Sequence, residues 1–287
     1  MEKNMKTAVI TAGGLGTRLL TFTKVAPKAI LPIYSKTFDY NNEPIMKPLI
    51  EHIFDNLYDL GFRKFCFIVN KISKSLIKDH FVTDQKFIKL LENRNSIEDK
   101  RFLKIIKTHD KKLKNSEIKW IIQESPSGFG DALSRAKKFV GDETFILHAA
   151  DAYFPNYLFM KNFISNFDKQ KADCSIIVEK RNRVKGYGIA EFKKKTDLVI
   201  HVEEKPKYPK SNFAILPVYI FKPKIFDALK KTSIGYNGEL QVTDGIMTLI
   251  KNKNKVIGLK YLKKWFDIGT PKNYFNAINY SYKKSFT

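Results

Sequence analysis

The sequence predicts an α/β fold with a Rossmann-like, mixed but mainly parallel central sheet and helices on both faces. In the first half of the chain, short apolar runs alternate with segments whose apolar residues recur at helical spacing. The second half carries both kinds of segment in a mixed order. A βαβ series favours parallel strands whose connecting helices cover the sheet. The 287 residues, 43% of them hydrophobic, are enough for a substantial buried core.

The first half of the chain is the source of the parallel-sheet prediction. Leu49, Ile53 and Leu57 recur at helical spacing, and Gly61 ends the helix that they predict. Buried strands are expected at residues 6–11, 64–70, 118–122 and 144–149. Helices are expected at residues 48–60, 73–81 and 130–140, and residues 84–117 are expected to be helical, charged and peripheral.

The second half of the chain predicts a continuation of the same domain. Strands are expected at residues 174–178, 187–192, 198–202, 213–221 and 256–261. Helices are expected at residues 223–230, 241–251 and 271–283. No linker rich in Gly, Ser or Pro divides the halves, and the sequence shows no internal repeat. We therefore expect one domain over residues 1–287.

The chain is strongly basic, with 52 Lys and Arg against 29 Asp and Glu and a net charge of +23. Such a surface attracts polyanions, among them nucleic acids, nucleotides and sugar phosphates. Because the lysines are scattered, we interpret most of them as a solvated face and expect no specific nucleic-acid partner. Cys66 and Cys174 have neither metal nor disulfide spacing. With no secretion signal and no apolar stretch of about 20 residues, these features predict a cytoplasmic protein without membrane contact.

Residues 11–28, TAGGLGTRLLTFTKVAPK, form a glycine turn flanked by cations. The turn lacks the third glycine of a dinucleotide fingerprint, because Leu19 stands there, and no Walker sequence is present. Consecutive glycines let backbone N–H groups approach an anion closely. Arg18 adds a planar multidonor cation and Lys28 a point charge. The combination predicts a phosphate site, whereas a bare structural turn does not explain the two cations.

These residues and later segments resemble the sugar-1-phosphate nucleotidyltransferases. The matching segments are, in order, AGGLGTR with APKAILPI, then QESPSGFGDA, AADAY, GYG, VEEKP, GELQVTD and WFDIGTP. The set covers nearly the whole chain and is most similar to UTP–glucose-1-phosphate uridylyltransferases of archaeal and bacterial type, with the thymidylyltransferases next. The resemblance implies a nucleotidyltransferase-type fold. Its nucleotide-proximal half would span about residues 1–155 and its sugar-phosphate-proximal half about 156–287.

The reaction that the resemblance implies is attack of a glucose 1-phosphate oxygen on the α-phosphorus of UTP, giving UDP-glucose and pyrophosphate. Such a transfer depends on positioning and on neutralisation of charge. The resemblance therefore implies Mg²⁺ as cofactor, held by Asp151 and Asp267 through oxygen ligands. UTP and glucose 1-phosphate are the expected small-molecule partners, and a homo-oligomer, dimer or tetramer, is expected.

The resemblance also implies roles for individual side chains. Arg18 would neutralise the leaving pyrophosphate and Lys28 the α- and β-phosphates, while Lys205 would grip the phosphate of the sugar. The nucleotide would be bound by Ala12, Gly13, Gly14, Gly16, Thr17, Gln123 and Gly128. The sugar phosphate would be bound by Gly188, Glu204 and Lys205. The Gln123 carboxamide can pair with a pyrimidine edge that uracil and thymine share.

Two departures from the usual family pattern bear on specificity. Asp131 stands where His or Gln often follows the glycine, and Pro217 occupies a place frequently given to glycine beside the sugar. A thymidylyltransferase, or another choice of nucleotide and sugar, therefore stays open. A catalytically silent regulatory or RNA-binding relative is the alternative of a different class. The five histidines form no recognisable ligand set.

Overall fold

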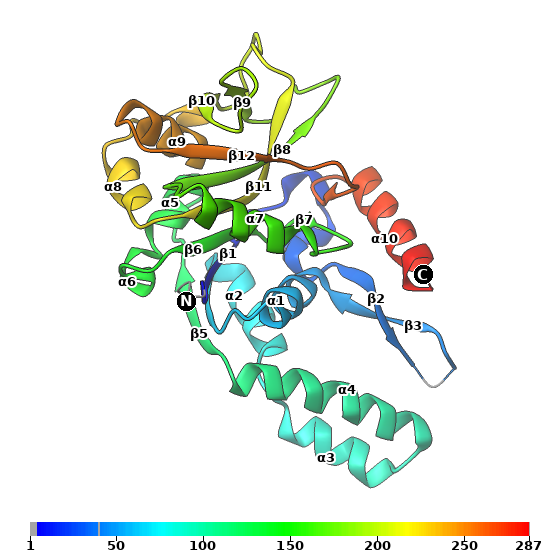
Figure 1. Cartoon of the computed structure of the whole chain (residues 1–287). Helices are drawn as coiled ribbons and strands as arrows, with labels where there is room; N and C mark the ends of the chain where they lie inside the picture. Colours follow the sequence, from blue (N-terminus) through cyan, green and yellow to red (C-terminus); the bar gives the residue numbers. More distant parts are fainter. Residues whose placement is uncertain (1–4, 40, 287) are drawn as a thin grey trace.

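The computed structural model describes residues 5–39 and 41–286, and within them the strands of both halves join one nine-stranded mixed sheet (Figure 1). The first half supplies β1 (Thr7–Ala12), β4 (Lys64–Val69), β5 (Glu117–Ile122) and β6 (Phe145–Ala149). The second half supplies β8 (Cys174–Lys180), β9 (Ile189–Phe192), β10 (Val199–Glu203), β11 (Phe213–Phe221) and β12 (Val256–Lys260). The order is β10-β9-β11-β6-β1-β4-β5, and β8 pairs with β11 and β12.

The sheet confirms the α/β prediction and shows where the halves meet. Strands β6, β1, β4 and β5 run parallel, as the alternating first half predicts. Strand β11 pairs antiparallel with β6, so the sheet continues from the first half of the chain into the second. This continuity supports the single domain, which stays a prediction.

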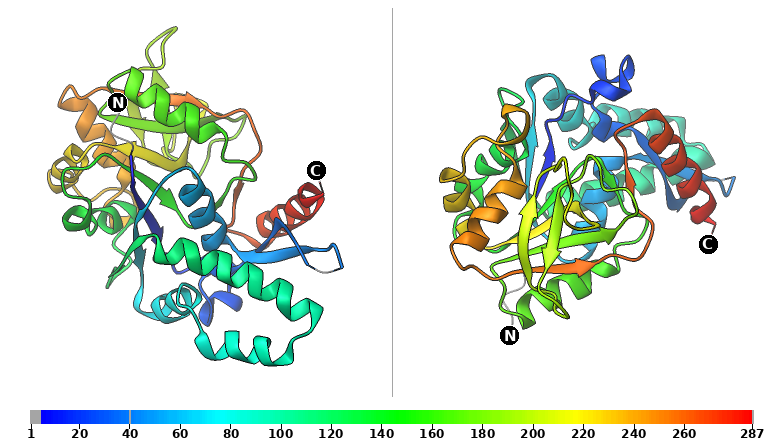
Figure 2. Two further views of the ribbon diagram at one scale, coloured as in Figure 1. Left: turned by 60° about the horizontal axis from the view of Figure 1, so that its bottom comes forward. Right: turned by 90° about the horizontal axis from the view of Figure 1, so that it is seen from above.

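Helices cover the sheet on both faces because its central strands are apolar on both sides. In β1, Ala8 and Ile10 belong to one buried cluster and Val9 to the other, as the two-residue period of a strand requires. The first cluster includes buried residues of α1 (Leu49–Asp59), α2 (Lys71–His80) and α7 (Phe159–Lys169). The second includes buried residues of α5 (Phe129–Ser134), α8 (Lys224–Lys230) and α9 (Val242–Lys251). Figure 2 shows the helices around the sheet from two further directions.

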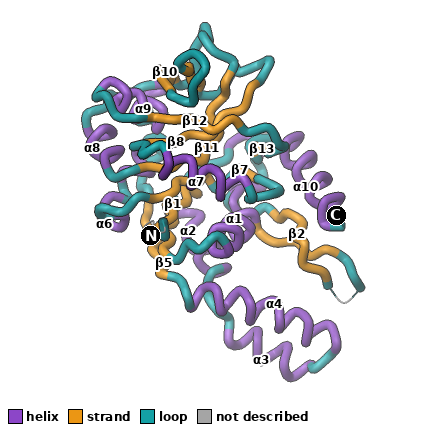
Figure 3. Tube along the Cα trace, viewed as in Figure 1, coloured by secondary structure: helices purple, strands orange, loops and turns teal. Residues whose placement is uncertain are grey.

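Two pairs of elements lie at the periphery of this core. Residues 84–117 are helical as predicted, with α3 (Gln85–Arg94) and α4 (Ile97–Lys114) side by side at the edge of the molecule (Figures 1 and 2). The chain reverses between them at Asn95, whose φ is 56°. Helix α10 (Pro271–Ser285) lies beside β2 (Pro32–Phe38), where the Tyr274 hydroxyl donates to the Pro32 carbonyl at 3.1 Å (Figure 3).

Some elements differ from the sequence predictions. The single helix expected at residues 130–140 is wrong: α5 ends at Ser134, and a short α6 (Lys137–Val140) follows. The sequence did not predict α7, the hairpin of β2 with β3 (Pro44–Pro48), or the small sheet of β7 (Ala152–Tyr153) and β13 (Phe266–Asp267). Within the described ranges, the helices are too short or too polar to cross a membrane.

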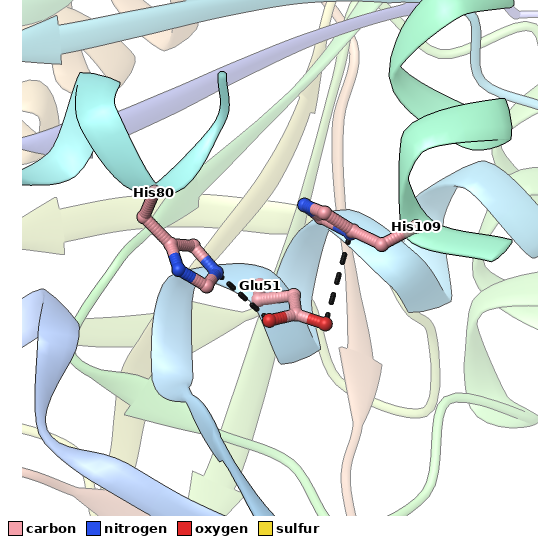
Figure 4. A group of neighbouring side chains, drawn as sticks. All are labelled: Glu51, His80 and His109. Carbon is pink, nitrogen blue, oxygen red and sulfur yellow. Dashed lines mark hydrogen bonds and ion pairs between the residues drawn. The ribbon is translucent and has the colours of Figure 1, made fainter. Parts of the chain in front are cut away.

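A buried carboxylate links α1 to the end of α2 and to α4. Glu51 of α1 is only 7% exposed and accepts a hydrogen bond from His80 at 2.8 Å (Figure 4). Its other oxygen lies 2.9 Å from Lys47 and 3.7 Å from the His109 ring. Burial alone would raise the pKa of Glu51, but the His80 hydrogen bond and the Lys47 charge outweigh burial and hold that pKa at about 2.

We expect Glu51→Gln to destabilise the protein by roughly 3 kcal/mol at neutral pH, because the fall in pKa from 4.5 to about 2 corresponds to that free energy. A carboxyl with a lowered folded-state pKa stabilises above its unfolded pKa and loses the effect as pH falls from about 4.5 toward 2. Urea unfolding at pH 7 and at pH 3 measures the free energy of unfolding of both proteins. The difference in this free energy between wild type and variant should be smaller at pH 3, and a difference independent of pH would contradict the explanation.

Candidate active site

A cavity of about 630 Å³ opens where the parallel strands β1 and β6 end. This is the edge at which open parallel sheets bind ligands. Every site residue predicted from the sequence lines it. These residues are Ala12, Gly13, Gly14, Gly16, Thr17, Arg18, Lys28, Gln123, Gly128, Asp151, Gly188, Glu204, Lys205 and Asp267.

The glycine loop after β1 forms one wall of the cavity. A Cβ on Gly13 would lie 2.9 Å from the Gln123 Oε1 atom, so a side chain there would displace the carboxamide. A Cβ on Gly14 would touch the end of the Lys28 side chain at 3.5 Å. Gly16 has φ of 66°, and the Thr23 hydroxyl donates to its carbonyl at 2.9 Å. The loop therefore keeps its backbone open to the cavity and places Lys28 beside it.

Gln123 and Gly128 lie on the wall formed after β5. Gln123 is 6% exposed, and its Nε2 donates to the Gly128 carbonyl at 3.0 Å and to Asp131 Oδ2 at 2.9 Å. Gly128 has φ of 108°, and a Cβ there would lie 2.3 Å from the Leu240 carbonyl oxygen. The two hydrogen bonds hold the Gln123 carboxamide against Gly128 and Asp131 in the lining of the cavity.

Asp151 and Asp267 come together from opposite halves of the chain. Asp151 follows β6, and Asp267 lies in β13, which pairs with β7 so that Asp267 is opposite Ala152. The Ile268 N–H donates to the Asp151 carbonyl at 2.8 Å. Lys28 forms an ion pair with Asp151. The two carboxyl groups therefore face one cavity, next to a lysine from the glycine wall.

The pKa values of the two carboxyl groups are shifted in opposite directions. Burial alone would raise the pKa of Asp151, but the charge and hydrogen bond of Lys28 hold that pKa below its ordinary value. Burial and then the negative charge of Asp151 raise the pKa of Asp267 above its ordinary value. Two half-buried acids thus repel each other, and one lysine is paired with the first of them. A divalent cation, which takes oxygen ligands, fits this donor set.

Arg18 reaches the same acidic pair from the glycine loop. A Cβ on Gly269 would lie 2.5 Å from an Arg18 Nη atom and 3.0 Å from Asp267 Oδ1. The guanidinium therefore lies beside Gly269 and close to the carboxylate that lacks the Lys28 partner. Lys28 thus places positive charge next to Asp151, and Arg18 places it next to Asp267.

Glu204 and Lys205 form the opposite wall. Glu204 Oε2 accepts a hydrogen bond from the Thr243 hydroxyl at 2.7 Å, and Lys205 Nζ lies 3.2 Å from Glu204 Oε1. A Cβ on Gly188 would lie 2.9 Å from Glu204 Oε2, so only glycine leaves this carboxylate in place. The Lys205 ammonium also lies over the Tyr236 ring, 4.9 Å from its centroid. This wall offers one cation and fixed hydrogen-bonding oxygens.

Several residues of the cavity were not singled out from the sequence. Tyr187, Glu239, Thr243 and Trp265 line it alongside the predicted set. All four lie inside the segments GYG, GELQVTD and WFDIGTP that carried the family resemblance, so a closer reading of those segments could have found them. Pro217, which the sequence singles out as a departure from the family pattern, lines the cavity as well.

A second possible metal cluster lies elsewhere. In the described residues, Glu51, His80 and His109 bring three ligand atoms within 4.8 Å of one another. None of the three lines the cavity, and Glu51 is already paired with Lys47 at 2.9 Å. We interpret this cluster as the structural tie described above. His148 beneath the site is fully buried, and burial lowers its pKa to about 4.

Comparison with known proteins identifies the family of the chain. The model of the nucleotidyl transferase family matches residues 7–284. The UTP–glucose-1-phosphate uridylyltransferase of Mycoplasma genitalium is 32% identical over 97% of this chain and 94% of its own length, and that of Bacillus subtilis is 29% identical over 93% and 87%. A crystal structure of UDP-glucose pyrophosphorylase complexed with UDP-glucose superposes with a TM-score of 0.80 at 25% identity, covering 98% of this chain and 99% of that one. The chain therefore belongs to the nucleotidyl transferase family.

Proposed function

We propose that the protein transfers a uridylyl group from UTP to glucose 1-phosphate, giving UDP-glucose and pyrophosphate, with Mg²⁺ as cofactor. The observation that carries the proposal is the meeting of Asp151 and Asp267 in one cavity, with Arg18 and Lys28 on one side and Lys205 on the other. Two polyanions must approach each other in this reaction, so positive charge on both sides of a metal-binding carboxylate pair is what the chemistry requires.

The glycine wall would hold the triphosphate. Backbone N–H groups at Gly13 and Gly14 have no Cβ between them and the cavity, which suits close approach of phosphate oxygens. Lys28 would neutralise the α- and β-phosphates and Arg18 the leaving pyrophosphate. Gln123 and Gly128 would contact the base. Asp151 and Asp267 would hold the Mg²⁺, which when bound supplies Lewis-acid stabilisation of the charge on the phosphoryl oxygens.

The opposite wall would hold the sugar phosphate. Lys205 would bind the phosphate as a point charge, and Glu204 would accept hydrogen bonds from ring hydroxyls. Gly188 lets the sugar approach this wall. The attacking oxygen belongs to the sugar phosphate itself and is already anionic, so the residues have to position it rather than deprotonate it.

The experiment that tests this proposal is a matrix of nucleoside triphosphates against sugar 1-phosphates, with release of pyrophosphate as readout, with and without Mg²⁺. The expected result is the largest kcat/KM with UTP and glucose 1-phosphate, and loss of activity with excess EDTA. A larger kcat/KM with dTTP would make the protein a thymidylyltransferase. Salt-sensitive RNA binding without transfer would favour the silent relative. The homo-oligomer stays a prediction, which light scattering of the purified protein tests.

A further inference from the structure

We propose that Asp131 fixes the orientation of the Gln123 carboxamide, so that the site selects pyrimidine triphosphates with an N3–H donor, uracil or thymine, over cytosine. Asp131 does not line the cavity of the carboxyl pair, so it acts as a positioning residue through Gln123. The inference rests on the proposed function in that the cavity has to bind a nucleoside triphosphate. Beyond that function, it explains why pyrimidines with an N3–H donor are accepted.

The surroundings of Gln123 decide which way its amide points. Its Nε2 lies 3.0 Å from the Gly128 carbonyl oxygen and 2.9 Å from Asp131 Oδ2. A carbonyl and a carboxylate oxygen only accept hydrogen bonds, so each uses one of the two amide protons. Turning the amide over would place Oε1 against both oxygens inside a site where Gln123 is 6% exposed. Such a buried contact between acceptors costs free energy, and the structure allows one orientation.

Asp131 is itself held in place. Arg135, four residues later, lies with its Nε 3.0 Å from Asp131 Oδ2 and donates from an Nη atom to Asp131 Oδ1 at 3.3 Å. Both carboxylate oxygens therefore face donors, and Oδ2 is shared between Arg135 and Gln123. The carboxylate cannot turn away from Gln123 without losing the Arg135 contacts.

The Gln123 oxygen is the atom left for a ligand. Oε1 points to Gly13, where it would lie 2.9 Å from a Cβ, and both residues line the cavity. A base placed there meets an acceptor. Uracil and thymine carry a proton on N3 and can donate to it, whereas N3 of cytosine carries a lone pair and would face the oxygen without a proton between them. Because uracil and thymine both carry this N3–H donor, the Gln123 oxygen does not distinguish between them.

The test measures affinity for UTP and CTP by isothermal titration calorimetry, a readout that does not need transfer. The wild-type protein should bind UTP more tightly. Asp131→Ala should reduce the UTP-to-CTP affinity ratio roughly tenfold, as expected for loss of one hydrogen bond to a charged group. Asp131→Asn keeps an oxygen that can accept from Gln123 and should restore most of the ratio. Arg135→Gln removes the contacts that hold Asp131 in place and should lower the ratio by less than Asp131→Ala does.

A double-mutant cycle separates positioning from a general effect on folding. Gln123→Ala should remove the remaining preference, and adding Asp131→Ala to it should change the ratio no further. An unchanged ratio in Asp131→Ala, or a further change in the Gln123→Ala background, overturns the proposal. A protein that shows the expected cycle but releases no pyrophosphate would refute the proposed function and leave the role of Asp131 standing. Absence of binding by either nucleotide would refute both.

Discussion

Replacing Asp151 or Asp267 by asparagine is expected to reduce pyrophosphate release from UTP and glucose 1-phosphate by roughly 1,000-fold or more. Both side chains face the same cavity, and removing either would leave a divalent cation with one anionic protein ligand where the reaction accumulates charge. The loss should appear in kcat at saturating substrates. Initial rates with coupled detection of pyrophosphate measure it over a range of Mg²⁺ concentrations.

The stability of the same variants provides the control. The pKa of Asp267 is raised by burial and by the charge of Asp151, so its charged form disfavours the fold at neutral pH without metal. Asp267→Asn should therefore unfold at the same or a higher temperature than wild type in EDTA. Asp227, 71% exposed and paired with Lys137 outside the cavity, offers the matched substitution, and Asp227→Asn should keep full activity. Wild-type rates in either cavity variant would refute the metal assignment.

The second large effect is expected from Lys205→Met. The change keeps the length of the side chain and removes the cation from the wall opposite the glycine loop. Loss of charge-assisted hydrogen bonds to a phosphate should raise KM for glucose 1-phosphate roughly 100-fold. KM for UTP should change little, because the triphosphate would lie against Arg18 and Lys28. Steady-state kinetics with each substrate varied in turn measure both constants.

Lys207 provides a neighbouring control for this experiment. It is an exposed lysine two residues further on, outside the cavity, and its ammonium lies over the Tyr208 ring. Lys207→Met removes the same charge from the same loop and should leave both KM values near wild type. An equal rise in KM for UTP and for the sugar phosphate in Lys205→Met would show that Lys205 does not distinguish the two substrates and would contradict its placement.

The sequence predicts which residues line the cavity better than it predicts which side chains they contact. It indicates the glycine turn with Arg18 and Lys28, because phosphate binding needs these residue types at close spacing. The meeting of Asp151 with Asp267 depends on strands β7 and β13 of two residues each, which are too short to leave a periodic pattern. Only the family resemblance paired these aspartates. The hydrogen bond from Gln123 to Asp131 could not be predicted either, because the orientation of a side chain depends on the tertiary structure around it.

Among the secondary structure elements, the errors have different causes. The sequence predicts one helix over residues 130–140, but the chain turns at Arg135 and Ala136 between α5 and α6. The β2–β3 hairpin lies outside the main sheet, and much of it is half-buried, which weakens its apolar alternation. Helix α7 was detectable, since Met160, Phe163 and Phe167 recur at helical spacing and are buried in the structure.

The pairing of β7 with β13 has a consequence for biosynthesis. Residue 151 leaves the ribosome more than a hundred residues before residue 267, so a growing chain can complete the glycine cradle and its parallel strands while still lacking the second carboxylate. A nascent chain that ends before residue 267 is thus unable to assemble the proposed ion site. The proposed chemistry therefore requires synthesis beyond residue 267.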